Sequence, residues 1–349
     1  MAAPSLVLQT TYAELLERCS RAAFDTSFVE EDGTFMAKTV RSRRYWYFQL
    51  PTKAGRGQRY VGPETPELLK RIKQHQAFVD DERERRALVS TLVRSFGMPQ
   101  PVTEIGETVA ALARAGIFRL RSVLVGTAAY QTYSAMLGEK LPSATLQTGD
   151  IDIAQFANIS AAAEDQMPPM LDILKAVDKT FRAVPTIHGN AVTSYAAKGG
   201  FGVDFLTPNQ GRETDKPKRL PALGTDAQPL RFLDFLIREP EPAVLLHGAG
   251  VYVNVPSPHR YAVHKLIISR RRPEGAAKRD KDLHQAEALL ALLAKKRTYD
   301  LKAAWAEADA RGQEWRKLLR EGFTQLSPQT QEMLMGVIPA PGKPAKRKS

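Results

Sequence analysis

The spacing of apolar residues changes several times along the chain, and each change predicts a different kind of element. Between residues 11 and 24, apolar residues such as Leu15, Leu16 and Cys19 recur with the helical period. The next three segments alternate apolar and polar residues around turns rich in Gly and Pro, which is typical of short strands: GTFMAKTV, RRYWYFQL and QRYVG. A long charged helix then begins at Thr65 and Pro66.

Helices and strands alternate after residues 97–101, GMPQP, where a shift in composition predicts a domain boundary. The pattern there predicts a helix around residues 105–112, the strand RSVLVG, a helix from Thr127, the strand DIDIAQF and the helix PPMLDILKAVD. A meander of FRAVPTI, TSYAAKG and FGVDFLTP follows. A polar loop over residues 209–228 then leads to the strands FLDFLIRE, AVLLHG and VYVNVP.

From residue 256 onward the apolar period is helical. The two clearest helices are SPHRYAVHKLIISRRR and RDKDLHQAEALLALLAKK, and two or three shorter helices come after them. The chain is therefore predicted to divide into a basic β/helical module (1–95), an α/β core (96–255), a helical domain (256–338) and a basic, Pro-rich, disordered tail (339–349).

Charge adds a partner class to this picture. The 349 residues carry a net charge of +12, and seven Lys or Arg residues but no acid lie between Gly33 and Pro63. Such a basic segment favours a polyanionic partner, either nucleic acid or a phosphorylated molecule. Four aromatic residues are interleaved with these cations, and they either stack on unpaired bases or form the core of a small sheet: Tyr45, Trp46, Tyr47 and Tyr60.

The cellular environment is predicted from what the sequence lacks. Cys19 is the single cysteine, which excludes an intramolecular disulfide framework and suits a reducing compartment. The first residues lack the charged and apolar regions of a secretory signal, and no apolar run is long enough to span a membrane. We expect a cytoplasmic protein without a membrane partner, and the sequence leaves its oligomeric state open.

The strand DIDIA carries two aspartates, Asp150 and Asp152, which share one face because residues i and i+2 of a strand point the same way. Asp204 lies in another apolar strand, FGVDFLTP. Burying ionised carboxylates is costly unless something compensates their charge. Three converging carboxylates suit Mg²⁺ or Mn²⁺, and two such ions promote displacement at phosphorus. The alternative is that these are solvated carboxylates on an edge strand.

Gly126 and Thr127 follow the strand VLV and open a helix. The N–H groups of a helix N-terminus bind phosphate, and a glycine there allows a ligand to approach the backbone closely. The alternative is that Gly-Thr at this position serves only as a helix cap.

These motifs, in this order, resemble the polymerase-β-like nucleotidyltransferase superfamily. More narrowly, the chain is similar to a bacterial branch with a nucleotidyltransferase fold in which DIDIA, VDFLTP and YAVHKLIISRRR…KDLHQAEALL recur after KTVRSRRYWYFQL…QRYVGPETPELL. The resemblance covers most of residues 30–300. It implies an α+β/α/β fold with a mixed-sheet nucleotidyltransferase core. Thr127 stands where serine is commoner, and the long separation from Thr127 to Asp150 implies an inserted loop that shapes the acceptor pocket.

The resemblance also implies roles for individual residues. Asp150 and Asp152 would bind both metal ions, and Asp204 would complete the second site as general base or ligand. Gly126 and Thr127 would hold the nucleotide phosphates. Lys265, with Arg272 or Lys281 as alternatives, would contact the triphosphate of the NTP substrate; otherwise these cations form a solvated helix face.

The implied reaction moves a nucleoside monophosphate from an NTP to an unknown acceptor: RNA such as a tRNA end, a protein side chain or a small molecule. The alternative is a catalytically silent nucleotidyltransferase fold that binds nucleic acid. A toxin or phage-defence role fits the superfamily.

Overall fold

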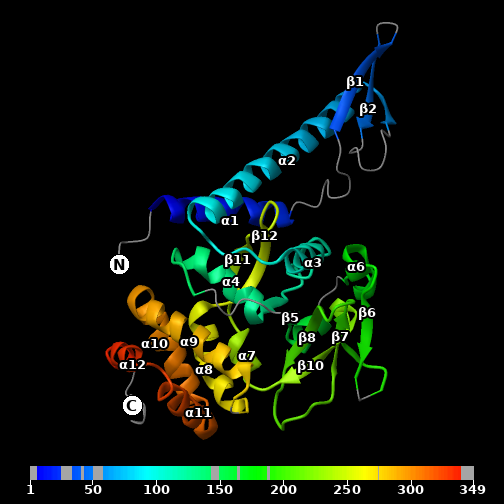
Figure 1. Ribbon diagram of the computed structural model, residues 1–349. Helices are drawn as coiled ribbons and strands as arrows, with labels where there is room; N and C mark the ends of the chain where they lie inside the picture. Colours follow the sequence, from blue (N-terminus) through cyan, green and yellow to red (C-terminus); the bar gives the residue numbers. More distant parts are fainter. Residues whose placement is uncertain are drawn as a thin grey trace.

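The computed structural model describes residues 6–24, 34–40, 43–49, 58–142, 149–162, 166–186, 189–273 and 275–338. Helix α1 (Leu6–Phe24) comes first, and it begins five residues earlier than predicted. Strands β1 (Thr34–Val40), β2 (Arg43–Gln49) and β3 (Gln58–Pro63) form an antiparallel sheet, as the alternating pattern predicted. Figure 1 shows this sheet at the end of α2 that projects from the rest of the molecule.

Helix α2 (Pro66–Ser90) connects that sheet to the main body. Its predicted cap is confirmed, because the side chain of Thr65 accepts a hydrogen bond from the N–H of Leu68 over 3.2 Å. The helix continues as the π-helical turn η2 (Thr91–Ser95) and stops before Gly97, which has a φ of +66°.

A mixed sheet of seven strands forms the centre of the molecule. Five strands follow the order β4 (Val123–Val125), β5 (Asp150–Ala154), β8 (Gly202–Pro208), β10 (Thr225–Leu230), β9 (Lys218–Leu220). The other two, β6 (Arg182–Pro185) and β7 (Val192–Ala196), join at β8 and complete the predicted meander. β5 and β8 are parallel, whereas β4 is antiparallel to β5. The hairpin of β11 (Pro240–Leu245) and β12 (Val251–Pro256) lies next to β4.

Helices surround this sheet and extend the core. The first group comprises α3 (Thr103–Arg114), α4 (Gly126–Leu137), α5 (Ala157–Ala162), α6 (Met170–Val177), η3 (Pro221–Leu223) and α7 (Leu233–Leu236). The second comprises α8 (Pro258–Arg271), α9 (Ala277–Lys296), α10 (Thr298–Ala310), α11 (Gln313–Phe323) and α12 (Pro328–Met335). One hydrophobic core runs through both groups, from Ile105 to Ile338. The boundaries proposed for separate domains stay predictions.

Two sequence predictions were wrong in detail. FLDFLIRE was expected to be a strand, but it contains the short helix α7, and its apolar residues are buried on all sides. The segment 209–228, expected to be a polar loop, contains β9 and the start of β10. The predicted tail, 339–349, lies outside the described residues. Among the helices that are described, none is long and apolar enough to cross a membrane.

Candidate functional site

The three predicted aspartates lie on neighbouring strands of the central sheet. Asp150 and Asp152 occupy β5 and are half-buried, whereas Ile151 and Ile153 on the opposite face are fully buried. The parallel register places Asp152 directly beside Asp204 of β8. Since paired residues on neighbouring strands point to the same face of a sheet, the three carboxylates share one face, as predicted.

Gly126 brings the start of α4 against Asp152. The antiparallel register places Val125, the last residue of β4, beside Asp152, and α4 begins at the next residue. A Cβ on Gly126 would lie 2.2 Å from Oδ2 of Asp152, and Gly126 has a φ of +67°. Glycine is therefore required here for the left-handed backbone and for the close approach of the carboxylate. Thr127 follows in the first helical turn, where backbone N–H groups have no partner within the helix.

Tyr261 of α8 holds the Gly126 peptide from another direction. Its hydroxyl donates to the carbonyl oxygen of Gly126 over 2.9 Å and lies 3.0 Å from Oε1 of Gln285. Burial raises the pKa of Tyr261 well above its usual value, so the hydroxyl keeps the proton that it donates. Its ring packs with those of Tyr130 and Tyr133, 6.1 and 5.2 Å between centroids. The turn at Gly126 is thus fixed by α8 as well as by the sheet.

Two of the three carboxylates have pKa values raised by their surroundings. Burial raises the pKa of Asp152 from 3.8 to about 6; repulsion by Asp204 and Asp150 adds to this, against attraction by Lys265 and Lys278. Burial also raises the pKa of Asp204, which a hydrogen bond from Ser194 opposes. Both groups would therefore gain stability from a cation placed beside them.

Helices α8 and α9 supply the cations of the site. Nζ of Lys265 lies 2.5 Å from Oδ1 of Asp282, and Nε of Arg272 lies 2.5 Å from Oδ2 of the same carboxylate. The side chain of Asp282 is only 3% exposed, so these two ion pairs compensate its buried charge. Lys265 also lies 5.4 Å from the ring centroid of Tyr261, and it attracts Asp152 electrostatically.

Lys281 and Lys278 complete the basic half of the site, which comprises Lys265, Arg272, Lys278 and Lys281. Burial lowers the pKa of Lys281, and repulsion by Lys265 adds to the shift. Four cations and one carboxylate, Asp282, therefore leave three positive charges facing the three aspartates. The structure brings Lys265 and both of its predicted alternatives, Arg272 and Lys281, to one place.

Sequence reasoning missed three residues of this arrangement: Tyr261, Lys278 and Asp282. A signal for two of them was present, since Lys278, Lys281 or Asp282, and Gln285 recur at steps of three and four residues along one helix. Their convergence on the aspartates depends on how α9 packs against α8, which a one-dimensional pattern does not show.

Comparison with known proteins gives this arrangement a family. A family profile described as "Nucleotidyltransferase" matches residues 103–309, which include every residue of the site. The chain belongs to this nucleotidyltransferase family. Among solved structures, an antigenic nucleotidyltransferase-like protein from Paracoccidioides brasiliensis is 14% identical, with 64% of this chain and 94% of that chain covered and a TM-score of 0.30. A search of curated proteins found no match.

In this nucleotidyltransferase the aspartates offer the oxygen ligands that Mg²⁺ prefers. Within the described ranges, however, no three His, Cys, Asp or Glu side chains converge into a group that would hold a metal ion. Residue types and raised pKa values both fit a divalent cation, and the metal site stays a prediction.

A cavity of about 860 Å³ in this nucleotidyltransferase lies elsewhere, between α1, α2, α3 and the loop joining β11 to β12. Neither the aspartates nor Gly126, Thr127 and Lys265 line it. The candidate site is therefore assigned from its reactive side chains and not from the volume of a cavity. Cys19, which does line the cavity, is not an activated nucleophile, since burial raises its pKa to about 11.

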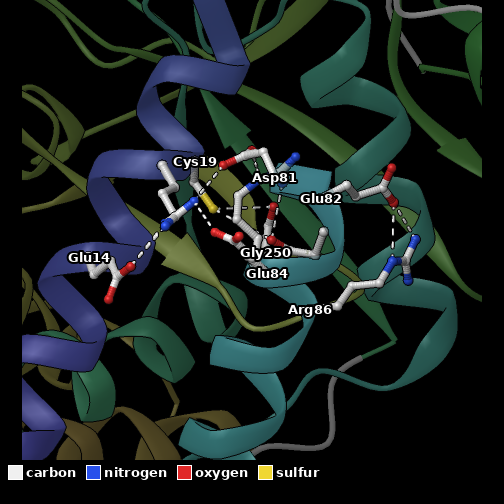
Figure 2. Close-up of polar contacts among 10 residues, drawn as sticks. Glu14, Cys19, Asp81, Glu82, Glu84, Arg86 and Gly250 are labelled. Atoms are coloured by element: carbon white, nitrogen blue, oxygen red, sulfur yellow. Dashed lines mark hydrogen bonds and ion pairs between the residues drawn. The ribbon is translucent and has the colours of Figure 1, made fainter. Parts of the chain in front are cut away.

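The polar contacts beside this cavity attach the N-terminal helices to the core (Figure 2). Arg18 of α1 contacts Asp81 and Glu84 of α2 at 3.0 and 2.7 Å. The Cys19 thiol lies 3.6 Å from the carbonyl oxygen of Gly250, and Arg85 of α2 donates to the carbonyl of Ala249 over 3.2 Å. Helix α2 is therefore fixed to both α1 and the β11–β12 loop.

Proposed function

We propose that the protein transfers a nucleoside monophosphate from an NTP to a hydroxyl group of an acceptor and releases pyrophosphate. The observation that carries the proposal is the contact of Gly126 with Asp152, beside Asp204 and opposite Lys265. It combines a helix N-terminus suited to phosphate with an acidic and a basic half. The order of the motifs supports membership of the polymerase-β-like superfamily.

The two halves match the two ends of the proposed substrate. The N–H groups at Gly126 and Thr127 would bind phosphate oxygens. The cations Lys265, Lys278 and Lys281 would neutralise the β- and γ-phosphates, which carry most of the charge that leaves as pyrophosphate. Buried Asp282 would keep Lys265 and Arg272 in place rather than touch the substrate.

In the proposed step the acceptor oxygen attacks the α-phosphorus. The bond from that phosphorus to the bridging oxygen breaks, and pyrophosphate leaves with its electron pair. The hydroxyl proton passes to a carboxylate, for which we propose Asp204, because its raised pKa makes it a stronger base than an exposed aspartate. Asp150 and Asp152 would hold Mg²⁺ or Mn²⁺, and the bound cation would supply charge neutralisation.

The test measures transfer directly. The protein is incubated with each α-labelled NTP, Mg²⁺ and either total RNA or total protein, and labelled acceptor and pyrophosphate are quantified. We expect Asp152→Asn and Asp204→Asn to reduce both products to background. Asp172→Asn, an exposed carboxylate on α6, is the matched control and should retain full activity.

Two results would contradict the proposal. One is activity in Asp152→Asn equal to that of Asp172→Asn. The other is salt-sensitive RNA binding by the wild type with neither NTP binding nor turnover, which would instead favour a catalytically silent, nucleic-acid-binding fold.

A further inference from the structure

The N-terminal sheet has one covered face and one open face. The covered face packs on α2 through Phe35, Phe48 and His75, whose ring centroids are 5.0 to 5.6 Å apart. Phe48 is 3% exposed and His75 is 8% exposed, so these rings form the small core of the module. None of these three rings belongs to the four aromatic residues, Tyr45, Trp46, Tyr47 and Tyr60, for which a core role was one of the two sequence alternatives.

Trp46 also belongs to the covered side of the sheet. Its indole N–H donates to Glu64 over 3.0 Å, and the guanidinium of Arg44 lies 5.5 Å from its ring centroid and 3.4 Å from the same carboxylate. These contacts tie β2 to the segment that enters α2. The same contacts give Trp46 a structural role, and the tyrosines of the other face are the better candidates for stacking on a base.

The opposite face carries three tyrosines that touch one another. The register of the strands pairs Tyr47 with Tyr60 and with Met36, and it pairs Tyr45 with Lys38. The Tyr60 ring centroid lies 5.5 Å from that of Tyr47 and 6.3 Å from that of Tyr45. Tyr60 is 53% exposed and Met36 is 40% exposed, so this tyrosine face (Met36, Lys38, Tyr45, Tyr47 and Tyr60) is open.

We propose that the tyrosine face binds single-stranded nucleic acid by stacking unpaired bases on its rings. Base stacking on aromatic side chains tolerates any sequence, and cations beside the rings meet the phosphates. Lys38 supplies such a cation, with its Nζ 4.7 Å from the Tyr47 ring centroid. No Asp or Glu occurs between Gly33 and Pro63 to oppose the approach of a polyanion.

Charge complementarity decides among the occupants of this face. An apolar peptide offers no charge to match Lys38 and the neighbouring basic residues, and a second copy of the sheet would bring the same cations face to face. A nucleic-acid strand offers flat apolar bases and phosphates together. The inference rests on the proposed function in one respect, because the bound nucleic acid is taken to be the acceptor of that reaction.

The test is fluorescence anisotropy with the full-length protein and a labelled 20-nucleotide RNA of mixed sequence, single-stranded or annealed to its complement. Tyr60→Ala should weaken single-strand binding about 5- to 150-fold. Tyr60→Phe keeps the ring and should bind as the wild type does. Tyr299→Ala removes a tyrosine that is 83% exposed on α10, far along the chain from the sheet, and it is the matched control.

Thermal unfolding of each variant separates binding from folding. The melting temperatures of Tyr60→Ala and Tyr299→Ala should agree within a few degrees. The inference is overturned if the wild type does not bind, if Tyr60→Ala and Tyr299→Ala bind alike, or if the duplex binds as tightly as the single strand. Transfer without RNA binding would refute only this inference. RNA binding that survives in Asp152→Asn, with no transfer by the wild type, would refute only the proposed function.

Discussion

Neutralising Asp152 should stabilise the metal-free protein at neutral pH, although it removes a carboxylate central to the proposed reaction. Burial, and then repulsion from Asp204, raise the pKa of Asp152 from 3.8 to about 6. A carboxyl whose pKa is higher in the folded state favours folding while it is protonated, below pH 3.8. It loses that contribution as the pH rises through 6.

The magnitude follows from the shift. About two pKa units, each worth about 1.4 kcal/mol, give a loss of about 3 kcal/mol in the free energy of unfolding between pH 4 and pH 7. The Asp152→Asn variant has no proton to lose at this position. Its stability relative to the wild type should therefore increase by about 3 kcal/mol across the same interval, with the difference complete by about pH 7.

Urea unfolding between pH 4 and pH 8, in buffer with a chelator, measures this difference. The control Asp172→Asn should follow the wild-type curve at every pH, because it changes an exposed carboxylate on α6. Excess Mg²⁺ should then stabilise the wild type more than Asp152→Asn. Parallel pH curves for wild type and Asp152→Asn, or a less stable Asp152→Asn at pH 8, would show that this aspartate serves the fold instead.

Three other predictions concern the same site. Gly126→Ala should destabilise the protein by more than about 1 kcal/mol and abolish NTP binding, because the new Cβ meets Asp152 and the left-handed φ disfavours alanine; an NTP affinity within two-fold of wild type by calorimetry would contradict this. Lys278→Ala and Lys265→Ala should each weaken NTP binding more than NMP binding, but only Lys265→Ala should also lower the melting temperature, because it leaves buried Asp282 with one partner fewer; equal losses for both nucleotides would remove the lysine from the site. Tyr261→Phe should lower turnover, and it should lower the free energy of unfolding by about 1–3 kcal/mol, because it leaves the buried acceptors Gly126 O and Gln285 Oε1 without their donor; unchanged turnover would show that the turn needs no such support.

The sequence predicted well where local pattern and position coincide. The aspartates could be placed on one face from their two-residue spacing, and Gly126 could be placed at a helix start from the strand before it. Phe232 to Ile237 were wrongly assigned to a strand, because a short run that is buried on every side has no polar face to set the period. β10 was missed because its pairing with β8 and β9 makes it a strand, whereas its own polar residues do not indicate one.

The basic half of the site shows more clearly that a sequence pattern does not predict where a side chain lies in the fold. Lys265 was a candidate by resemblance alone, yet its fixed position depends on Asp282, which is 17 residues away along the chain. The N-terminal aromatics divided between two faces because alternation along β2 separates Tyr45 and Tyr47 from Trp46 and Phe48. Which set was covered depended on where α2 packs, and only the structure gives that.

The length of helix α2 determines both how far the N-terminal sheet lies from the core and which way the sheet faces. Its 25 residues span about 37 Å; the sheet packs near His75, and the contacts to α1 begin at Asp81. Each residue inserted between these points would move the sheet outward by about 1.5 Å and rotate it by about 100°. Two extra residues would turn the tyrosines to nearly the opposite side, whereas seven would restore their heading to within about 20° at about 10 Å greater reach. The length of this helix therefore sets both the distance of the sheet from the core and the direction that its tyrosines face, and the same direction recurs only after about two turns.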